Sequence, residues 1–470
     1  MIRWLVLVGV VAALASVSYG QTLESTAEER KDVSVTVYNE DLGLIREVRE
    51  LKLPAGVLSL RFQDVASRID PTSVNVEVLR GLRDFTVVEQ NYEFDLISPN
   101  KLMEKYIGRM IELVVKHPRT GEESSLSAKL LSMNGGPIYR IDEEIHVGHP
   151  GRVVLPGIPE NLIARPTLIW FLDSRGGEGE IEVSYLTSGM NWKADYVALL
   201  GDKDEIMDVT AWVTLTNTSG AGYRDAKLKL IAGKVHRVER KVTIPRREVE
   251  TAAAMALKPG VVEEPFFEYH LYTLPRRTTL KDNQTKQVEL LKAHQVGLVK
   301  EYILPPKRAL YRPGRRYKGV EKEHVVVMIR FENTEQNNLG KPLPAGIFRF
   351  YKKDSGGNLQ LVGEDMIEHV PRDEKVSLRL GEAFDIVAER IQTDYKEISK
   401  GKVYEYEYKI TLHNAKDEDV TVRVEEDIRG DWEILQYTHD PYKESAHRVI
   451  FQVPVPKRSE SILSYRVRVR

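Results

Sequence analysis

Apolar and polar residues alternate along most of this chain, beginning at Val33. A period of two places apolar side chains on one face of a strand, as in antiparallel sheets packed on a single side. These runs recur at intervals of roughly ten residues, with hardly any helical pattern between them. We therefore predict an all-β protein of several antiparallel β-sandwiches. The clearest runs are 33–37, 58–62, 74–78, 181–185, 209–215, 325–331, 404–412, 420–424 and 463–469.

Three strands of this pattern end in asparagine, at Asn217, Asn333 and Asn414. Each is followed by a polar turn and then by another alternating strand. Asparagine tolerates left-handed backbone and bonds to nearby turn backbone, so it suits these positions. Immunoglobulin-like hairpins show such a pattern, and we predict at least two sandwiches, one of them an immunoglobulin-like domain at 323–470.

Residues 101–156 differ from the rest, because their strands are short and joined by tight turns. One turn contains Asn134-Gly135, a strong hairpin signal between apolar strands. This spacing predicts a small barrel of the SH3 or Sm-like kind. Just before it, Ser98-Pro99 can cap and begin a short helix that Gly108 ends.

The length of 470 residues calls for about three domains. We divide the chain by the strand pattern and by its polar stretches. A possible helix at 246–258 is assigned to the linker. The predicted parts are a signal peptide at 1–20, a flexible lead-in at 21–32, N-terminal sandwich strands at 33–100, the small barrel at 101–156, a sandwich at 157–240, a linker at 241–264, a connecting β region at 265–322 and the C-terminal sandwich at 323–470.

The first residues have the order of an export signal. Arg3 precedes an apolar run at 4–15, and the small residues Ser18 and Gly20 stand three places and one place before Gln21. A membrane anchor is the alternative, but about 12 apolar residues are too few for a span that needs ~20. We expect cleavage before Gln21, export to the periplasm or beyond, and no membrane span in the mature chain.

The charge balance and the absence of cysteine exclude several classes of function. Lys and Arg number 68 against 70 Asp and Glu, a formal net charge of −2, so the chain lacks the basic footprint of a dedicated nucleic-acid binder. It contains no cysteine, which excludes disulfides, thiolate metal sites and cysteine nucleophiles. Stability must come from packed cores.

Candidate chemistry is sparse. His146 and His149 lie three residues apart, but no third ligand accompanies them, so we predict no metal and no cofactor. A second candidate is the strand that carries Glu268 and His270. These two could form an acid–base pair, or they could be polar positions of a half-exposed strand. The cluster of Asp365, Glu368 and His369 has the same two readings. No catalytic residue is assigned.

Several longer phrases carry a family resemblance. They are Asn-Leu-Ile-Ala-Arg-Pro at 161–166, Ser-Tyr-Leu-Thr-Ser-Gly-Met-Asn-Trp-Lys-Ala-Asp-Tyr at 184–196, Ala-Trp-Val-Thr-Leu-Thr-Asn at 211–217, and the runs 266–272, 279–288, 343–351 and 380–385. With them the chain resembles the bacterial exported proteins of the domain of unknown function 4139 family, and more distantly the mucoidy-inhibitor-A family. The resemblance extends from about residue 33 to the C-terminus. It implies an exported β-rich protein and supplies no catalytic residues.

Two function classes remain from the sequence. The first is a non-enzymatic envelope protein that binds another protein or a surface polysaccharide, as multiple β-domains without a cofactor motif indicate. The second is a hydrolase of envelope glycans or peptides, whose acids and histidines would be brought together by folding. A deep cleft with convergent titratable groups would favour the hydrolase. A shallow patch or an open sheet edge would favour the binding protein.

Overall fold

The computed structural model describes residues 21–93, 95–117, 119–148, 151–159, 162–233, 235, 262–267, 269–307, 310–311 and 319–470. Strands make up most of these residues, and they form four sheets. The one α-helix among them is α1 (Pro99–Lys105). The prediction of an all-β protein with several sheets is confirmed. No helix in the described ranges is long and apolar enough to cross a membrane.

The first sheet has ten strands, some of which precede residues 101–156 in the sequence and some of which follow them. Its centre is the antiparallel pair of β3 and β11, each 21 residues long. The strands are β1 (Thr22–Ser25), β2 (Arg30–Tyr38), β3 (Gly43–Gln63), β4 (Asn75–Leu82), β5 (Phe85–Glu93), β11 (Thr167–Thr187), β14 (Tyr223–Ala232), β15 (Val262–Phe266), β16 (Tyr269–Thr273) and β17 (Thr278–Leu280).

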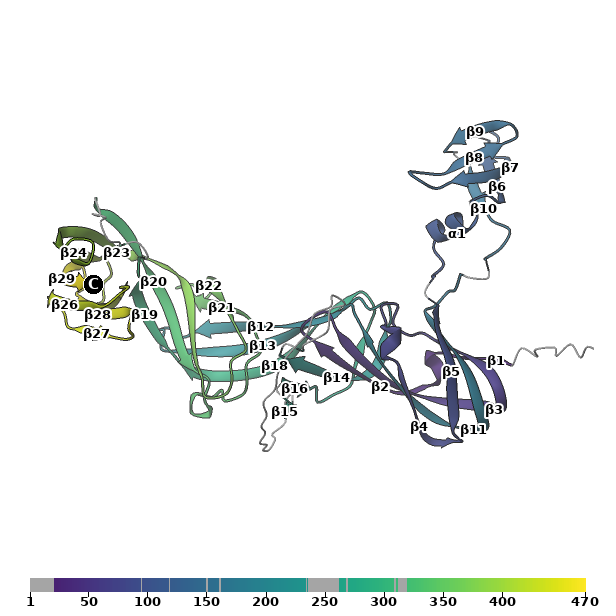
Figure 1. Ribbon diagram of the computed structural model, residues 1–470, viewed down its shortest axis with the longest axis horizontal. Coiled ribbons are helices and arrows are strands. Elements are labelled where there is room, and N and C mark those ends of the chain that lie inside the picture. Colours follow the sequence, from purple (N-terminus) through teal and green to yellow (C-terminus); the bar gives the residue numbers. More distant parts are fainter. Residues whose placement is uncertain are drawn as a thin grey trace, which may run out of the picture.

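A smaller five-stranded sheet stands apart from the rest of the molecule, with α1 at its base (Figure 1). Its order is β10-β6-β7-β8-β9, and a separate core that includes Leu113, Leu130 and Tyr139 fills it. Ser98 caps α1 by accepting the N–H of Lys101, as predicted. The strands are β6 (Met110–Lys116), β7 (Glu123–Ser132), β8 (Ile138–Ile141), β9 (Glu144–Val147) and β10 (Arg152–Val154).

Two further sheets continue the molecule toward its C-terminus, in line with the first sheet (Figure 1). The middle sheet has the order β18-β13-β12-β21-β22, and the last has the order β26-β29-β24-β23-β20-β19-β25-β28-β27. The middle strands are β12 (Met190–Leu200), β13 (Ile206–Asn217), β18 (Gln284–Gly297), β21 (Gly346–Lys353) and β22 (Leu359–Ile367). The last sheet holds β19 (Val299–Leu304), β20 (Glu321–Glu332), β23 (Lys375–Ser399), β24 (Val403–Asn414), β25 (Val420–Asp427), β26 (Trp432–Tyr437), β27 (Pro441–Lys443), β28 (Arg448–Val455) and β29 (Ser459–Val469).

The chain passes repeatedly between neighbouring sheets. It crosses between the first and middle sheets after β11, β13 and β17, and between the middle and last sheets after β18, β20 and β22. After β13, β20 and β24, the next strand pairs in parallel with an earlier one: β14 with β2, β21 with β12, and β25 with β19. The earlier strand is in each case half of an antiparallel pair. The same arrangement, an antiparallel pair of strands with a later strand added in parallel to its first member, therefore occurs three times.

The three asparagines lie at the corners where these crossings or turns begin. All are buried, and each amide donates to at least two backbone carbonyls of the segments that follow. Asn333 Nδ2, for example, lies 2.7 Å from the carbonyl oxygen of Lys341 and 2.8 Å from that of Pro371. The side chain thus satisfies buried backbone groups that no strand partner reaches.

Three boundaries differ from the sequence prediction. Residues 21–32, expected as a flexible lead-in, include β1 and the start of β2, and β1 pairs in parallel with β3. The predicted sandwiches at 33–100 and 157–240 share one sheet through the β3–β11 pair. Residues 346–367 belong to the middle sheet, not to the C-terminal one, because β21 pairs with β12. The short helix predicted at 246–258 lies outside the described residues.

Candidate functional site

A groove of about 1160 Å³ runs between the N-terminal strands and the corner that follows β13. One wall comes from the short helix η1 (Ala27–Glu29) and the start of β2. The other comes from the β13–β14 corner and from β17 with the turn after it. Segments almost 200 residues apart therefore meet here: Lys227 Nζ lies 2.9 Å from an Asp32 carboxylate oxygen, at a separation of 195 positions.

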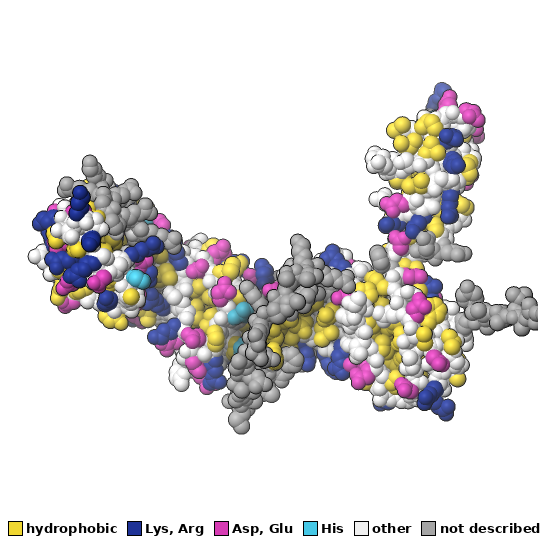
Figure 2. Space-filling model, in the orientation of Figure 1, with side chains coloured by type: hydrophobic (Ala, Val, Ile, Leu, Met, Phe, Trp, Pro, Cys, Tyr) yellow, Lys and Arg dark blue, Asp and Glu magenta, His cyan; other side chains and the backbone are white. Residues whose placement is uncertain are grey.

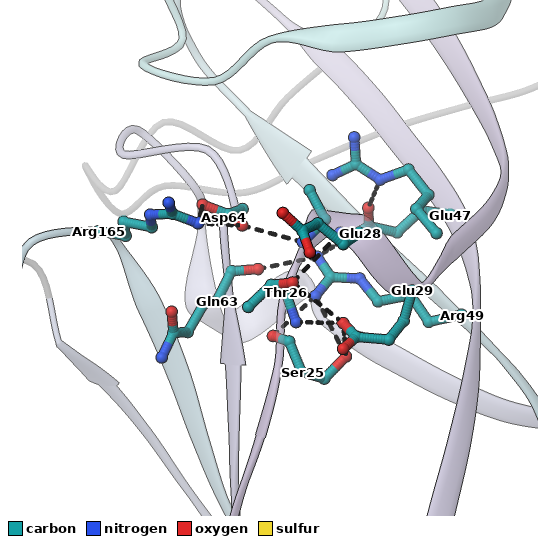
Figure 3. A network of polar contacts seen from close by, with 11 residues as sticks. Ser25, Thr26, Glu28, Glu29, Glu47, Arg49, Gln63, Asp64 and Arg165 are labelled. Carbon is teal, nitrogen blue, oxygen red and sulfur yellow. Dashed lines mark hydrogen bonds and ion pairs between the residues drawn. The ribbon is translucent and has the colours of Figure 1, made fainter.

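A buried ion network lies behind the first wall. Arg49 and Glu47 are both fully buried, and Arg49 Nη2 lies 3.0 Å from Glu47 Oε1. Arg49 also donates to the carbonyl oxygens of Ser25, at 3.0 Å, and Gln63, at 2.8 Å, so that it ties β1 to β3 (Figure 3). Burial lowers the pKa of Arg49, although the neighbouring Glu47 opposes that shift.

Arg30 completes the network and lines the groove. Its Nε donates to the second carboxylate oxygen of Glu47, and its side chain is 8% exposed. Its outer amino group, Nη2, has no hydrogen-bond partner in the described part of the chain. Arg49, Glu47 and Arg30 together carry one uncompensated positive charge. A buried cation of this kind favours an anionic acceptor beside it.

The turn before Arg30 is held rigidly. Thr26 and Glu29 form a capping box on η1, and Asp64 Oδ2 accepts the N–H of Ala27 at 2.9 Å. Asp64 has a positive φ of 64°. It also forms an ion pair with Arg165 (Figure 3), whose Nη1 lies 3.1 Å from Asp64 Oδ2. These contacts fix one rim of the groove in place.

A second group of charges joins Asp32 of the first wall to Lys227 and Arg277 of the opposite side. Desolvation would raise the pKa of Asp32, but hydrogen bonds from Lys227 and Arg277 outweigh it and leave that pKa below its usual value. Asp32 therefore stays ionised at neutral pH. Arg224 and Lys281, both exposed, line that opposite side, and neither has an ion pair with an acid in the ranges described.

The groove lining contains cations and acids in nearly equal numbers, and they differ in how far they are paired. Three of its cations lack an acidic partner for at least one donor group: Arg30, Arg224 and Lys281. Among the five lining acids, Asp32, Asp64 and Asp225 pair with arginine or lysine, Asp282 accepts the N–H of Gly220 at 2.9 Å, and Glu28 is exposed without an ion pair in the described ranges. On this side of the molecule Lys, Arg, Asp and Glu are otherwise interspersed (Figure 2).

The histidines and acids singled out from the sequence lie elsewhere. His146 is on β9, near Glu144 at 3.5 Å, and His149 is outside the described residues. His270 is on β16, opposite Ala232 of β14, while Glu268 is outside the described residues. No group of three or more metal-ligating side chains occurs in the ranges that the structure describes.

The second candidate cluster has local structural contacts. Asp365 accepts the backbone N–H of Arg379 at 2.7 Å, and His369 Nδ1 accepts that of Ala345 at 3.2 Å. Glu368 and His369 are exposed beyond the end of β22. Asp365 therefore anchors β22 to β23, and His369 holds the segment before β21.

Sequence analysis missed the buried network, although the pattern contained a signal for it. Ile45, Glu47, Arg49 and Leu51 occupy alternate positions of β3, and Ile45 and Leu51 are buried. An opposite-charge pair two positions apart on an apolar strand face predicts a buried ion pair. Arg30 could not be added from the sequence, because its contact depends on the pairing of β2 with β3.

The fold defines a multi-sheet β-protein with a polar groove between its N-terminal strands and the β13–β14 corner. The chain belongs to the family described as "Domain of unknown function (DUF4139)", whose model matches residues 181–469. The match begins within β11 and ends with β29. The groove therefore has one wall before the matched region and one inside it. No curated protein matches this chain.

Proposed function

We propose that this is an exported, non-enzymatic protein of the cell envelope that binds an acidic surface polysaccharide in the groove beside Arg30. The supporting observation is that Arg224 and Lys281 are exposed in the groove lining without an ion pair in the described ranges, in front of the Arg49–Glu47–Arg30 network, which carries one net positive charge. Carboxylates of a sugar acid would accept charge-assisted hydrogen bonds from Arg224 and Lys281.

The shape and composition of the groove support a polymer. It is open, it is bordered by segments of the first sheet and of the β13–β14 corner, and its volume exceeds what one sugar ring fills. Arg224 and Lys281 offer these contacts along its rim. The hydrolase alternative would need a protonated acid here, whereas the lysine and arginine beside Asp32 keep its pKa low.

Calorimetric titration with oligogalacturonate, a chain of sugar acids, tests this proposal. We expect binding by the wild type and at least a tenfold weaker affinity for the double variant Arg224→Glu/Lys281→Glu. Lys402→Glu, an exposed change in the turn between β23 and β24, should bind as the wild type does. The methyl-esterified oligomer should not bind, because its carboxylates are neutral. Equal affinity for the esterified oligomer, or none for either, would reject the proposal.

Export is the second part of the proposal, supported by the order of residues 1–20. A chain that begins at Gln21 keeps every described strand, since β1 begins at Thr22 and the carbonyl of Gln21 accepts the N–H of Ser59 at 3.1 Å. Intact-mass measurement of protein from envelope fractions should give a chain that begins at Gln21. A chain that retains Met1 in the cytoplasmic fraction would contradict export.

A further inference from the structure

A second groove, of about 430 Å³, lies on the middle sheet. It follows β18, which pairs with β13 on one side and, in the described ranges, with no strand on the other. Six consecutive residues of β18, 288–293, line the groove. Because consecutive side chains of a strand point to opposite faces, a groove that contacts all six must run along the open edge of the strand.

The walls of this groove are apolar. Leu274 and Pro275 come from the loop between β16 and β17, and Leu339 and Leu343 come from the segment between η3 (Glu335–Asn337) and β21. Leu290 lies on the floor, and its side chain is 7% exposed. It is the extra residue of a β-bulge, since Glu289 is opposite Trp212 and Leu291 is opposite Ala211. Bulges commonly redirect side chains beside binding sites.

The rim of the groove is positively charged. Arg276, Lys292 and Lys341 are exposed, and none has an ion pair with an acid in the part of the chain that is described. Glu289 is the one acid in the lining, so three cations oppose a single carboxylate. This excess selects an acidic occupant.

The open edge is limited in length. At the end of β18, Asn337 bonds both backbone groups of Gly297, and Asn338 donates to the carbonyl oxygen of Gln295 at 3.2 Å. Lysines on an edge strand can simply prevent aggregation. Here, however, leucines of two loops line a groove beside the edge, between its capped end and Val288.

We propose that β18 binds an extended acidic segment of a partner protein, which adds to its free edge as a further strand. Backbone hydrogen bonds to β18 provide the affinity, and alternate side chains provide the specificity. Apolar residues of the segment lie against Leu274, Leu290 and Leu339, and its carboxylates face the cationic rim. This site lies wholly within the family match and is independent of the first groove.

Fluorescence anisotropy with a labelled peptide of alternating glutamate and valine tests the inference on the mature chain. The double variant Arg276→Glu/Lys292→Glu should bind at least tenfold more weakly than the wild type. Lys353→Glu is the matched control, because Lys353 is exposed at the tip of the β21–β22 hairpin, on the far side of the same sheet. All three proteins should have the same thermal midpoint, since each change is at an exposed side chain.

Two further peptides separate strand addition from charge attraction. A peptide with lysine in place of glutamate should bind at least tenfold more weakly. A glutamate–valine peptide N-methylated on alternate residues keeps its charge but loses backbone donors, and it should not bind. Equal binding of the methylated peptide, or no binding of the parent peptide, overturns the inference. A dimer seen by sedimentation that the double variant dissociates would instead assign this edge to a second copy of the chain.

Discussion

The guanidinium carbon of Arg49 lies 3.6 Å from the centroid of the Phe62 ring. Both side chains are fully buried on β3, so the cation is stacked on an aromatic face inside the core of the first sheet. It also donates to Glu47, to the hydroxyl of Ser25 and to two backbone carbonyls, of Ser25 and Gln63. Arg49 therefore connects the N-terminal strand, the core and the wall of the first groove.

Replacement of Arg49 by alanine should strongly destabilise the protein. The change removes a fully buried side chain that stacks on Phe62 and donates to two backbone carbonyls, while Glu47 keeps Arg30 as its partner. Truncation of a large buried side chain to alanine costs about 2–5 kcal/mol. Urea unfolding followed by circular dichroism measures the loss. Lys52→Ala is the control, because Lys52 of the same strand is 82% exposed and pairs with Glu178, which is itself 59% exposed. It should cost less than about 1 kcal/mol, and similar losses for both variants would contradict the role given to Arg49.

Replacement of Asn333, the buried asparagine after β20, should also lower the free energy of unfolding. Asn333→Ala removes two amide hydrogen bonds to the carbonyls of Lys341 and Pro371 and the acceptor for the N–H of Gly340. Buried groups left unpaired should lower the unfolding free energy by about 2–3 kcal/mol. Asn91→Ala, at an exposed position, should stay within about 0.5 kcal/mol of the wild type in the same measurement. A neutral Asn333→Ala would show that the corner does not need its side chain.

The stability should decline in alkaline solution. Burial raises the pKa of Tyr92, Tyr223 and Tyr406 to about 12, whereas an unfolded tyrosine has a pKa of about 10. The folded state therefore holds these protons more tightly. Their contribution to stability is complete below pH 10 and is lost as the pH rises through 12.

Urea midpoints measured between pH 8 and 12, together with phenolate absorbance, test this dependence. Tyr223→Phe removes one such group and should make the decline shallower. An unfolding free energy that is constant up to pH 12 would show that these tyrosines ionise equally in both states.

The last sheet should require β19. This strand lies between β20 and β25, with antiparallel pairing to the first and parallel pairing to the second, and so joins the two halves of the sheet. A fragment of residues 298–470 should show a β-type far-UV spectrum and a single thermal transition. A fragment of residues 319–470 keeps β20 but lacks β19, and it should not fold. If both fragments melt at the same temperature, β19 is dispensable.

The sequence revealed most strands but few of their partners. Alternation identifies runs such as 404–412 because each strand has one buried face, and that property is local. One partner of β14 is β2, almost 200 residues earlier, and no local pattern encodes such a pairing. For the same reason, the boundary drawn at 323 separated β20 from β19 and placed β21 in the wrong sheet.

For the candidate sites too, the sequence showed local features but not the contacts between distant segments. The three asparagines were recognised as turn positions, but their burial and double donation depend on distant carbonyls. Neither groove was predicted, because each is assembled from segments brought together by the parallel pairings and the crossings. Histidine and acid spacing pointed to Asp365 and His369, whose contacts are with local backbone.

The repeated passage of the chain between sheets has a mechanical consequence. Three connections cross each of the two junctions, and strands on either side of a junction are neighbours in sequence. A force applied to the two ends of the chain cannot separate the sheets by extending a single linker. Each sheet contains strands whose next strand in the sequence belongs to the neighbouring sheet. The force is resisted by whole ladders of hydrogen bonds at once. Such a molecule can transmit tension along its length without lengthening at its joints.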